Sequence, residues 1–297
     1  MQIWRSVEAS ITNASGHSFS IQHKQSISGG SINHAYRIDD ESGTERRSYF
    51  LKLNQANKLK MFEAEAEGLS ALASSGAIRV PQPLCSGQAD DQAWLVMEYI
   101  AFGKGNVDST QLLGEQIATL HACHSDRFGW KRDNTIGATA QLNSRNYDWI
   151  DFYREQRLGF QFRLADRNGF SGSLQQKGEQ LMDHLDLFFS SYQPKASLLH
   201  GDLWGGNRAF DKMGQPVIFD PALYYGDREA DIAMTELFGG FGSEFYDAYN
   251  AVWPLDEGYA IRKDLYNLYH ILNHVNLFGA SYAAQAESML DRLLAEI

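Results

Sequence analysis

The chain has few cysteines, few prolines and no long apolar run. Its 297 residues include two cysteines and six prolines. Cys85 and Cys123 cannot build a disulfide framework, so this cysteine usage is typical of a reducing compartment, and we expect a cytoplasmic protein. No stretch of 18 uncharged apolar residues is present, so we expect no membrane span. The opening MQIWRSVEAS lacks a basic region followed by an apolar one, so we expect no signal peptide.

Positive charge is also scarce. Lysine and arginine number 26 against 37 acidic residues, which gives a net charge of −11. An acidic chain disfavours nucleic acid as a partner, because that partner needs a basic face. A phosphate-bearing ligand needs only a local basic site and stays open. The length and the 43% hydrophobic content suffice for one large domain or two lobes.

The first 100 residues are patterned mainly as strands. Alternating segments at 19–27, 34–40 and 47–54, and a pair of segments within 83–100, predict a sheet. In the third of these, Tyr49, Leu51 and Leu53 fall on one face and Lys52 on the other. The segment 58–76 predicts one helix that ends at Gly76.

Beyond a glycine-containing break at 101–108 the pattern becomes helical. We predict helices at 109–124 and near 146–166, 173–190, 228–238, 243–252 and 258–295, with short apolar strands at 197–199 and 216–220. The predicted class is α+β, with a small sheet lobe over 1–101 and a larger, mostly helical lobe over 102–297.

The segment LLHGDLWGGN, residues 198–207, is the most specific signal for chemistry. Asp202 is followed five residues later by Asn207, and Asp220 ends an apolar strand 13 residues further on. Phosphoryl transfer requires one carboxylate that accepts a proton from the attacking hydroxyl, together with oxygen ligands for Mg²⁺. These residues supply the parts that the reaction requires, namely one Asp for the hydroxyl and an Asn with a second Asp for the metal.

Three weaker features precede this segment. SGGSIN, which contains Gly29 and Gly30, is either a plain hairpin turn or a loop that approaches phosphates. Lys52 is either a solvated strand lysine or a phosphate ligand that needs a carboxylate partner. The next helix offers Glu63, Glu65 and Glu67, and their spacing of two places them on different faces. The strand WLVMEYI is either a core strand or a hinge that pairs with an adenine edge.

Taken together, the order of these features resembles the protein-kinase-like fold, in its aminoglycoside-phosphotransferase-like branch. The segments LLHGDLWGGN, FDPALYYGDREADIAMTELFGGF and LYNLYHILNHVNLFG resemble the fructosamine kinase (ketosamine-3-kinase) family more closely still. SGGSINHAYRI, YFLKLN and MFEAEAEGL extend this resemblance over nearly the whole chain.

The resemblance implies a bilobal kinase that uses ATP and Mg²⁺ to phosphorylate the sugar 3-hydroxyl of fructosamine or ribulosamine adducts, as a repair of glycated amines. It places Asp202 as the catalytic base, Asn207 and Asp220 on Mg²⁺, and Lys52 on the phosphates in a pair with Glu65. It further implies a phosphate loop and an adenine hinge, formed by Gly29 and Gly30 and by Glu98, Tyr99, Ile100 and Ala101 respectively.

Differences from protein kinases concern the substrate and its control. Gly201 stands where protein kinases carry an arginine that answers a phosphorylated loop, so we expect no such switch. The ring of Trp204 either packs against the sugar or only fills space in the wall of the catalytic loop. Asp227 or Glu229 is a candidate for the substrate's ammonium group, whereas Asp231 and His200 are expected to brace the loop.

Two other functions stay open at this point. One is a kinase of another small hydroxyl compound, of the aminoglycoside or choline type. The other is a nucleotide-binding pseudokinase that regulates a partner. The acceptor itself, either a small-molecule or a protein-linked ketosamine, and the oligomeric state, with a monomer as one possibility, are not given by the residues.

Overall fold

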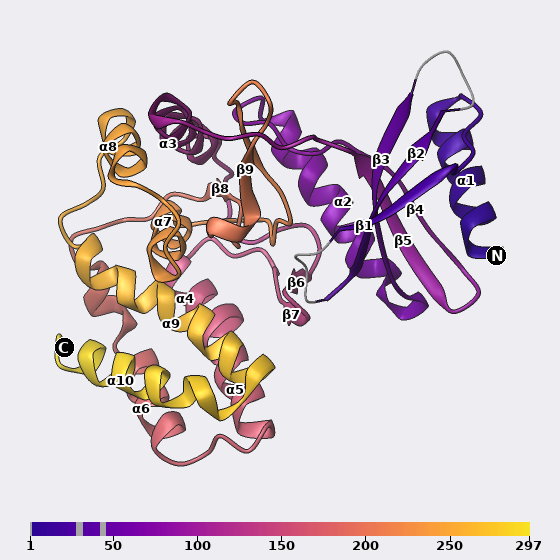
Figure 1. The fold of residues 1–297 in the computed structure, drawn as a ribbon. Coiled ribbons are helices and arrows are strands. Elements are labelled where there is room, and N and C mark those ends of the chain that lie inside the picture. The colour runs from indigo at the N-terminus through magenta and orange to yellow at the C-terminus, as the bar shows by residue number, and fades with distance from the viewer. Residues whose placement is uncertain (1, 28–31, 42–45) are drawn as a thin grey trace. The chain divides into compact units, whose positions relative to one another are not determined.

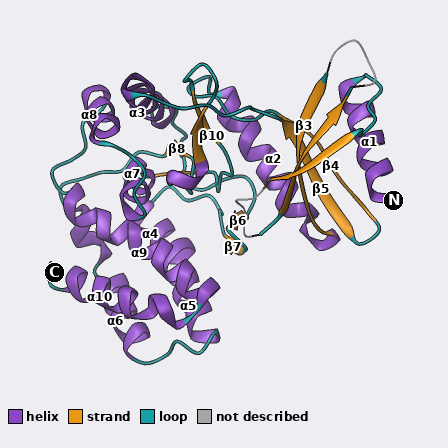
Figure 2. Cartoon of the chain, viewed as in Figure 1, coloured by secondary structure: helices purple, strands orange, loops and turns teal. Residues whose placement is uncertain are grey.

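The computed structural model describes residues 2–27, 32–41 and 46–297. By their contacts the residues form two compact units. The first consists of Met1–Asn106 and Ala209–Asp220, and the second of Val107–Arg208 and Pro221–Ile297. The segment 209–220 therefore clusters with the N-terminal residues, which differs from a single boundary near residue 101. The first unit holds the five-stranded sheet, and the second unit is mostly helical (Figure 2).

The first unit is built on an antiparallel sheet with the strand order β1-β2-β3-β5-β4. Its strands are β1 (His23–Ile27), β2 (His34–Asp40), β3 (Arg47–Gln55), β4 (Pro83–Ala89) and β5 (Gln92–Glu98). Its helices are α1 (Gln2–Ser15), the 3₁₀ turn η1 (Ala56–Lys58) and α2 (Leu59–Ser74). β10 (Pro216–Ile218) pairs with β9 (Arg208–Phe210) in a separate small ribbon. The strands and the helix predicted before residue 100 are thus present.

Helices α1 and α2 cover opposite faces of this sheet (Figure 1). Val7 and Ile11 of α1 pack with Leu51 and Leu53 of β3 in one buried cluster. Because side chains alternate along a strand, Lys52 points to the opposite face, where α2 lies. We did not predict α1 from the sequence, although Ile3, Val7 and Ile11 recur at the helical spacing of four.

The second unit is mostly helical. Its helices are α3 (Val107–His121), α4 (Trp149–Tyr153), the π-helical η2 (Arg154–Leu158), α5 (Gly159–Arg167), α6 (Ser173–Asp183), η3 (Leu185–Phe189), η4 (Gly205–Asn207), α7 (Arg228–Leu237), α8 (Ser243–Val252), α9 (Tyr259–Phe278), η5 (Ala280–Tyr282) and α10 (Ala283–Leu294). Short strand pairs are formed by β6 (Asn134–Ile136) with β7 (Thr139–Gln141), and by β8 (Ser197–Leu199) with β11 (Tyr224–Gly226).

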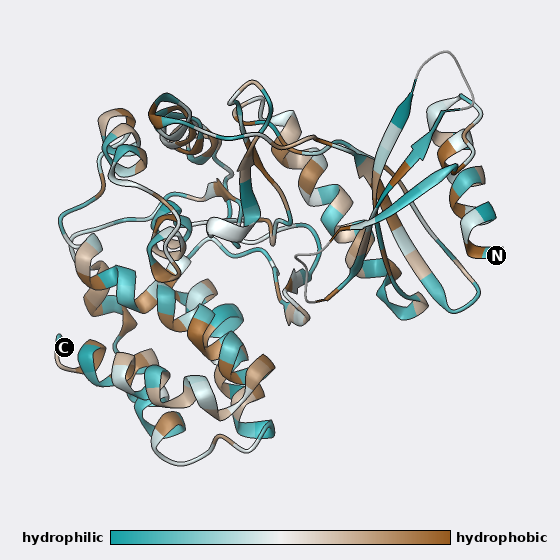
Figure 3. Ribbon diagram, in the orientation of Figure 1, coloured by the Kyte–Doolittle hydropathy of each residue, from teal (hydrophilic) through white to brown (hydrophobic). Residues whose placement is uncertain are grey.

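Helix α9 lies at the centre of this unit and contacts α5, α7 and α10. Hydrophobic and hydrophilic residues are mixed along these helices (Figure 3), and α9 is enclosed on all sides, since every residue from Leu265 to Asn273 is buried. The single helix predicted over 258–295 is wrong, because the chain breaks at Gly279, whose φ is +83°. A glycine tolerates this left-handed conformation and ends the helix there.

Among the described residues, no helix has both the length and the apolar character needed to cross a membrane.

Candidate active site

Lys52 is the centre of a buried ionic cluster in the first unit. Its Nζ lies 2.6 Å from Glu65 Oε1 and 2.6 Å from Asp220 Oδ1. The lysine side chain is 7% exposed, so it needs these carboxylates to remain charged. Burial by itself would lower the pKa of Lys52, but the two carboxylates outweigh it, and the pKa lies above its usual value. The expected Lys52–Glu65 pair is therefore present.

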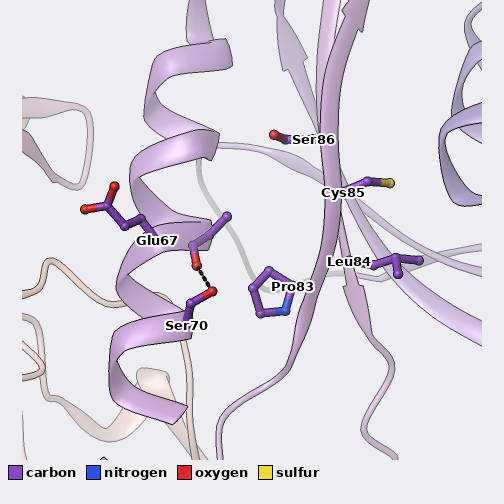
Figure 4. A pocket seen from close by; sticks show the side chains of 7 residues that line it. Glu67, Ser70, Pro83, Leu84, Cys85 and Ser86 are labelled. Carbon is purple, nitrogen blue, oxygen red and sulfur yellow. Dashed lines mark hydrogen bonds between the residues drawn. The ribbon is translucent and has the colours of Figure 1, made fainter. Parts of the chain in front are cut away.

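Only one of the three glutamates on α2 reaches this cluster. Glu65 faces the sheet, and burial raises the pKa of its carboxyl against the opposing effect of Lys52. Glu63 is exposed, and Glu67 lines a different cavity of about 280 Å³ between α2 and β4 (Figure 4). None of the predicted site residues lines that cavity. In Figure 4 the side chains of Leu84 and Cys85 point away from α2 across the strand.

Asp220 has an unusual backbone. Its φ is +58°, in the left-handed region that few non-glycine residues adopt. Such a conformation costs on the order of 1–3 kcal/mol and persists only where the surroundings hold it. One carboxylate oxygen contacts Lys52, and 45% of the side chain is exposed. Asp220 therefore combines a strained backbone with a carboxylate that is partly open to a ligand.

The predicted hinge begins at the last residue of β5, in the same unit. The Glu98 carboxylate accepts from Arg79 Nη2 at 2.7 Å, and its backbone N–H donates to Gln82 O. Tyr99 lies under the Arg37 guanidinium, Ile100 is buried, and Ala101 leads into Phe102. The other predicted nucleotide contacts, Gly29 and Gly30, lie outside the described residues.

One aromatic pair beside this hinge was not predicted from the sequence. Phe102 stacks on Phe219, with ring centroids 5.5 Å apart and planes 18° apart. Phe219 directly precedes Asp220, and Phe102 is 52% exposed. The two positions are more than 100 residues apart in the chain, so no local pattern could have predicted that they meet.

The loop that contains Asp202 belongs to the second unit. Asn207 Nδ2 donates to Asp202 Oδ2 at 3.0 Å and to the Asp202 carbonyl at 2.9 Å. Because the amide nitrogen of Asn207 donates both of these hydrogen bonds, the amide oxygen is the atom that could bind a metal. Amide oxygens are ligands that Mg²⁺ accepts. The short turn η4 brings the two residues together.

Asp231 holds this loop from α7. Its carboxylate accepts from the backbone N–H groups of His200, at 2.7 Å, and Gly201, at 2.8 Å. His121 Nε2 lies 3.2 Å from the same carboxylate. Burial opposes the charged form, but these hydrogen bonds keep the pKa of Asp231 below its usual value. His200 Nδ1 in turn accepts from the Asp202 N–H at 3.2 Å. The bracing expected of His200 and Asp231 is confirmed.

Gly201 is required by the geometry of the loop. Its φ is +82°, and a Cβ there would lie 2.1 Å from the Ala222 carbonyl oxygen. Any side chain would collide with that backbone, so the arginine found in protein kinases does not fit here.

Trp204 is the exposed ring of the loop. It is 38% exposed and makes an edge contact with Phe238, with centroids 6.3 Å apart. A Cβ on Gly206 would lie 2.3 Å from this ring, so the glycine allows the indole to lie flat over the backbone. The ring therefore presents apolar surface two residues from Asp202.

Asp227 and Glu229 do not fit the contact predicted for them. Both side chains are fully buried. Asp227 caps α7 and accepts from the hydroxyls of Tyr192 and Tyr266, while Glu229 forms a two-bond ion pair with Arg262 at 2.7 and 3.1 Å. Burial raises the pKa of both carboxyls. Neither carboxylate can reach a substrate ammonium group, so we correct this assignment to a structural one.

His121, Cys123 and His124 are close together in the sequence, at the end of α3 and just beyond it. Among the described residues, no group of three histidine, cysteine or acidic side chains could hold a metal ion. His121 serves in the hydrogen-bond network of Asp231 instead.

These features define a class of protein. A sheet lysine paired with a helix glutamate, together with an Asp-x-x-x-x-Asn loop braced by a helix aspartate, is the arrangement of kinase-like phosphotransferases. The structure of a gentamicin complex of the aminoglycoside phosphotransferase APH(2″)-IIa has this fold, with a TM-score of 0.60 at 14% identity over 99% of this chain and 94% of that one. The chain is thus an α+β protein with the aminoglycoside-phosphotransferase-like fold.

The fructosamine kinase family model matches residues 3–296, and the chain belongs to that family. A Synechocystis protein named "Probable ketoamine kinase" is 47% identical over 98% of this chain and 97% of its own length. The chloroplastic protein-ribulosamine 3-kinase of Arabidopsis thaliana is 43% identical over 91% of this chain and 82% of its own. A crystal structure of a Haemophilus somnus protein named "Putative fructosamine-3-kinase" has a TM-score of 0.89 at 31% identity and covers 98% of this chain and 97% of that one.

Family membership makes the protein an enzyme, a phosphotransferase of the ketosamine kinase type that uses a nucleotide.

Proposed function

We propose that this enzyme transfers the γ-phosphoryl group of ATP to the sugar 3-hydroxyl of a ketosamine. The observation that carries the proposal is the Asp202–Asn207 pair, held in a loop whose backbone is fixed by Asp231. The fructosamine and ribulosamine kinases among its relatives support a sugar adduct on an amine as the acceptor.

In this proposal the first unit binds the nucleotide. Lys52, held by Glu65, contacts the phosphates, and the loop at Gly29 and Gly30 covers them. Glu98, Tyr99, Ile100 and Ala101 offer backbone groups to the adenine. The stacked pair Phe102 and Phe219 adds an apolar surface beside this hinge.

Oxygen donors on this chain fit a magnesium ion. The amide oxygen of Asn207 and the half-exposed carboxylate of Asp220 are the ligands we propose. A bound Mg²⁺ neutralises charge on the β- and γ-phosphates.

Asp202 acts on the acceptor. Its carboxylate orients the sugar hydroxyl and accepts its proton as the new O–P bond forms and ADP leaves. Asn207 donates to that carboxylate and so fixes its direction. The exposed ring of Trp204 packs against the sugar from the same loop.

Phosphorylation at the 3-position makes a ketosamine unstable, so the proposed role is the removal of glycation damage from small amines or protein lysines. We propose a cytoplasmic location, supported by the two cysteines, both of which are unpaired. The acidic net charge supports a partner other than nucleic acid.

The test is ATP consumption by the purified full chain with ribulosyl-lysine, fructosyl-lysine, an aminoglycoside and choline, each in separate reactions. We expect turnover with a ketosamine and a product phosphorylated at the sugar 3-oxygen, as located by NMR. Turnover only with an aminoglycoside or choline would favour the other small-molecule kinase, and ATP binding without turnover on any acceptor would contradict the proposal.

A further inference from the structure

A small cavity in the second unit lies apart from every residue assigned above to catalysis. Its volume is about 140 Å³, and it is lined by Tyr192, Gln193, Lys195, Ser197, Arg228 and Trp253. This volume suits a phosphate-sized group and is well below the ~300 Å³ at which drug-sized pockets begin. The lining comes from the segment before β8, the first residue of β8, the start of α7 and the residue after α8.

Positive charge on the lining is not neutralised by ion pairs. Lys195 is exposed, forms no salt bridge with a described residue and has its Nζ 6.0 Å from the centroid of the Trp253 ring. Arg228 is 3% exposed, and its guanidinium donates only to uncharged oxygens: Tyr249 Oη at 3.0 Å, the Trp253 carbonyl at 2.8 Å and the Pro254 carbonyl. A buried arginine normally has a carboxylate partner, because an unpaired charge is costly to desolvate.

The carboxylates nearest in the sequence are already matched to other groups. Asp227 accepts from the hydroxyls of Tyr192 and Tyr266, and Glu229 pairs with Arg262. Asp256 also pairs with Arg262, at 2.6 Å. Glu229 and Asp256 also attract the Arg228 guanidinium electrostatically, but among the described residues no carboxylate forms a hydrogen bond or ion pair with either cationic side chain of the lining.

A buried hydroxyl provides a second, independent sign of a ligand. Ser197 is fully buried and lines the cavity, yet its Oγ has no hydrogen-bond partner. A buried polar group without a partner costs about 1–3 kcal/mol. An oxyanion in the cavity would accept from this hydroxyl and from the two cationic side chains.

A continuous hydrogen-bond path leads from this cavity to the catalytic loop. Arg228 donates to Tyr249 Oη, and Tyr249 Oη lies 2.9 Å from His121 Nδ1. His121 Nε2 lies 3.2 Å from Asp231 Oδ2, the atom that also accepts from the His200 N–H. With Tyr249 donating to Nδ1 and His121 donating from Nε2, every link has one donor and one acceptor.

We propose that this cavity binds a phosphate-sized oxyanion, either free phosphate or a phosphate monoester, and that the bound anion stabilises the catalytic loop through the Arg228–Tyr249–His121–Asp231 path. The anion places a negative charge beside Arg228, which starts this path, and also contacts Ser197, three residues before His200. The effect on turnover rests on the proposed function, whereas binding does not.

Binding is tested by equilibrium dialysis of radiolabelled inorganic phosphate against the full chain, with saturating ADP to occupy the nucleotide site. Glycerol 2-phosphate competes in a second arm, and the better ligand identifies the source. We expect saturable binding at one site, at least tenfold weaker in Lys195→Glu and at least threefold weaker in Ser197→Ala. Lys212→Glu, the same charge change on an exposed lysine of the first unit, is the matched control and keeps wild-type affinity.

Absence of saturable binding, or equal binding by the Lys195→Glu and Lys212→Glu variants, overturns the site. The coupling is tested by kcat at saturating ATP and acceptor, with phosphate against chloride at equal ionic strength. We expect kcat to rise at least twofold, and the rise to be lost in Lys195→Glu. Binding without a change in kcat overturns the coupling alone. If no acceptor is turned over, the proposed function fails while the dialysis result still decides the site.

Discussion

Asp231 binds the backbone N–H of Gly201 at 2.8 Å and thereby ties helix α7 to a loop thirty residues earlier in the chain. The same carboxylate accepts from the His200 N–H and from His121, so one buried side chain satisfies three donors. The loop that presents Asp202 therefore has its conformation set by a residue that touches no reactant.

Removing this carboxylate tests its positioning role. In Asp231→Ala the N–H groups of His200 and Gly201 lose their acceptor, and each buried unsatisfied donor costs about 1–3 kcal/mol. We expect the free energy of unfolding to fall by about 2–4 kcal/mol in urea titrations, and kcat to fall with little change in the KM for ATP. A loss of stability with an unchanged kcat in the folded fraction would show that Asp231 supports the fold only.

Asp202→Asn tests the catalytic base. The amide keeps the size of the carboxylate and can still accept from Asn207, so the loop should stay folded. General-base catalysis contributes about 10²- to 10⁴-fold, and we expect kcat to fall by that factor. ATP affinity, measured by calorimetry, should remain near the wild-type value. Substantial remaining turnover would refute the assignment.

Two glutamates on α2 provide a matched pair of variants for the nucleotide site. Among the described residues, Glu65→Gln leaves Lys52 with Asp220 as its one carboxylate partner, so the lysine is held less firmly toward the phosphates. We expect the KM for ATP to rise about tenfold, which corresponds to about 1.4 kcal/mol. Glu67→Gln makes the same chemical change two residues along the helix, outside this cluster, and should leave the KM for ATP unchanged. Equal effects of the two variants would contradict the role given to Glu65.

Trp204→Leu tests the packing of the sugar against the indole. Leucine keeps apolar character but loses the flat ring that lies over Gly206. We expect the KM for the ketosamine to rise at least fivefold and the KM for ATP to stay within twofold in steady-state kinetics. If both KM values rise equally, the ring is part of the loop wall and does not contact the sugar.

Because His270 is buried, we expect the stability of the folded protein to fall at acid pH. Burial lowers the pKa of His270 to about 3, so the folded protein keeps this side chain neutral. The unfolded chain binds a proton below about pH 6.5, so stability is lost as the pH falls from about 6.5 toward 3, by at most about 1.4 kcal/mol per pH unit. We expect Tm to fall less between pH 7 and pH 5 in His270→Gln than in the wild type. Parallel pH profiles would exclude His270 as a source of acid lability.

Much of the fold could be predicted because its signals are local. The alternation in 47–54 places Leu51 and Leu53 on one face and Lys52 on the other, and the structure shows that arrangement. Helix α1 was missed although its apolar residues recur at a spacing of four, and the break at Gly279 was missed inside a longer helical pattern. In both cases the sequence contains the relevant pattern, but that pattern is weaker than the patterns of the adjoining segments.

The candidate site was predictable only in part. The pair of Asp202 and Asn207 could be predicted because the two residues are five positions apart in one short loop, so their side chains must lie close together. The choice of Glu65 among three glutamates came from resemblance to a family, since helix periodicity does not say which face meets the sheet. Asp227 and Glu229 were misplaced because the acidic letters of GDREAD show charge and do not show burial.

The alternating strands, the order of the polar motifs and the glycines of the catalytic loop follow from the amino-acid sequence, because they depend on neighbours along the chain. Which groups are buried together follows from the packing of the helices and cannot be derived from local sequence. The path from Arg228 through Tyr249 and His121 to Asp231 joins residues from three helices, separated by as many as 128 positions. Such contacts depend on how helices pack, and packing is a property of the whole folded unit.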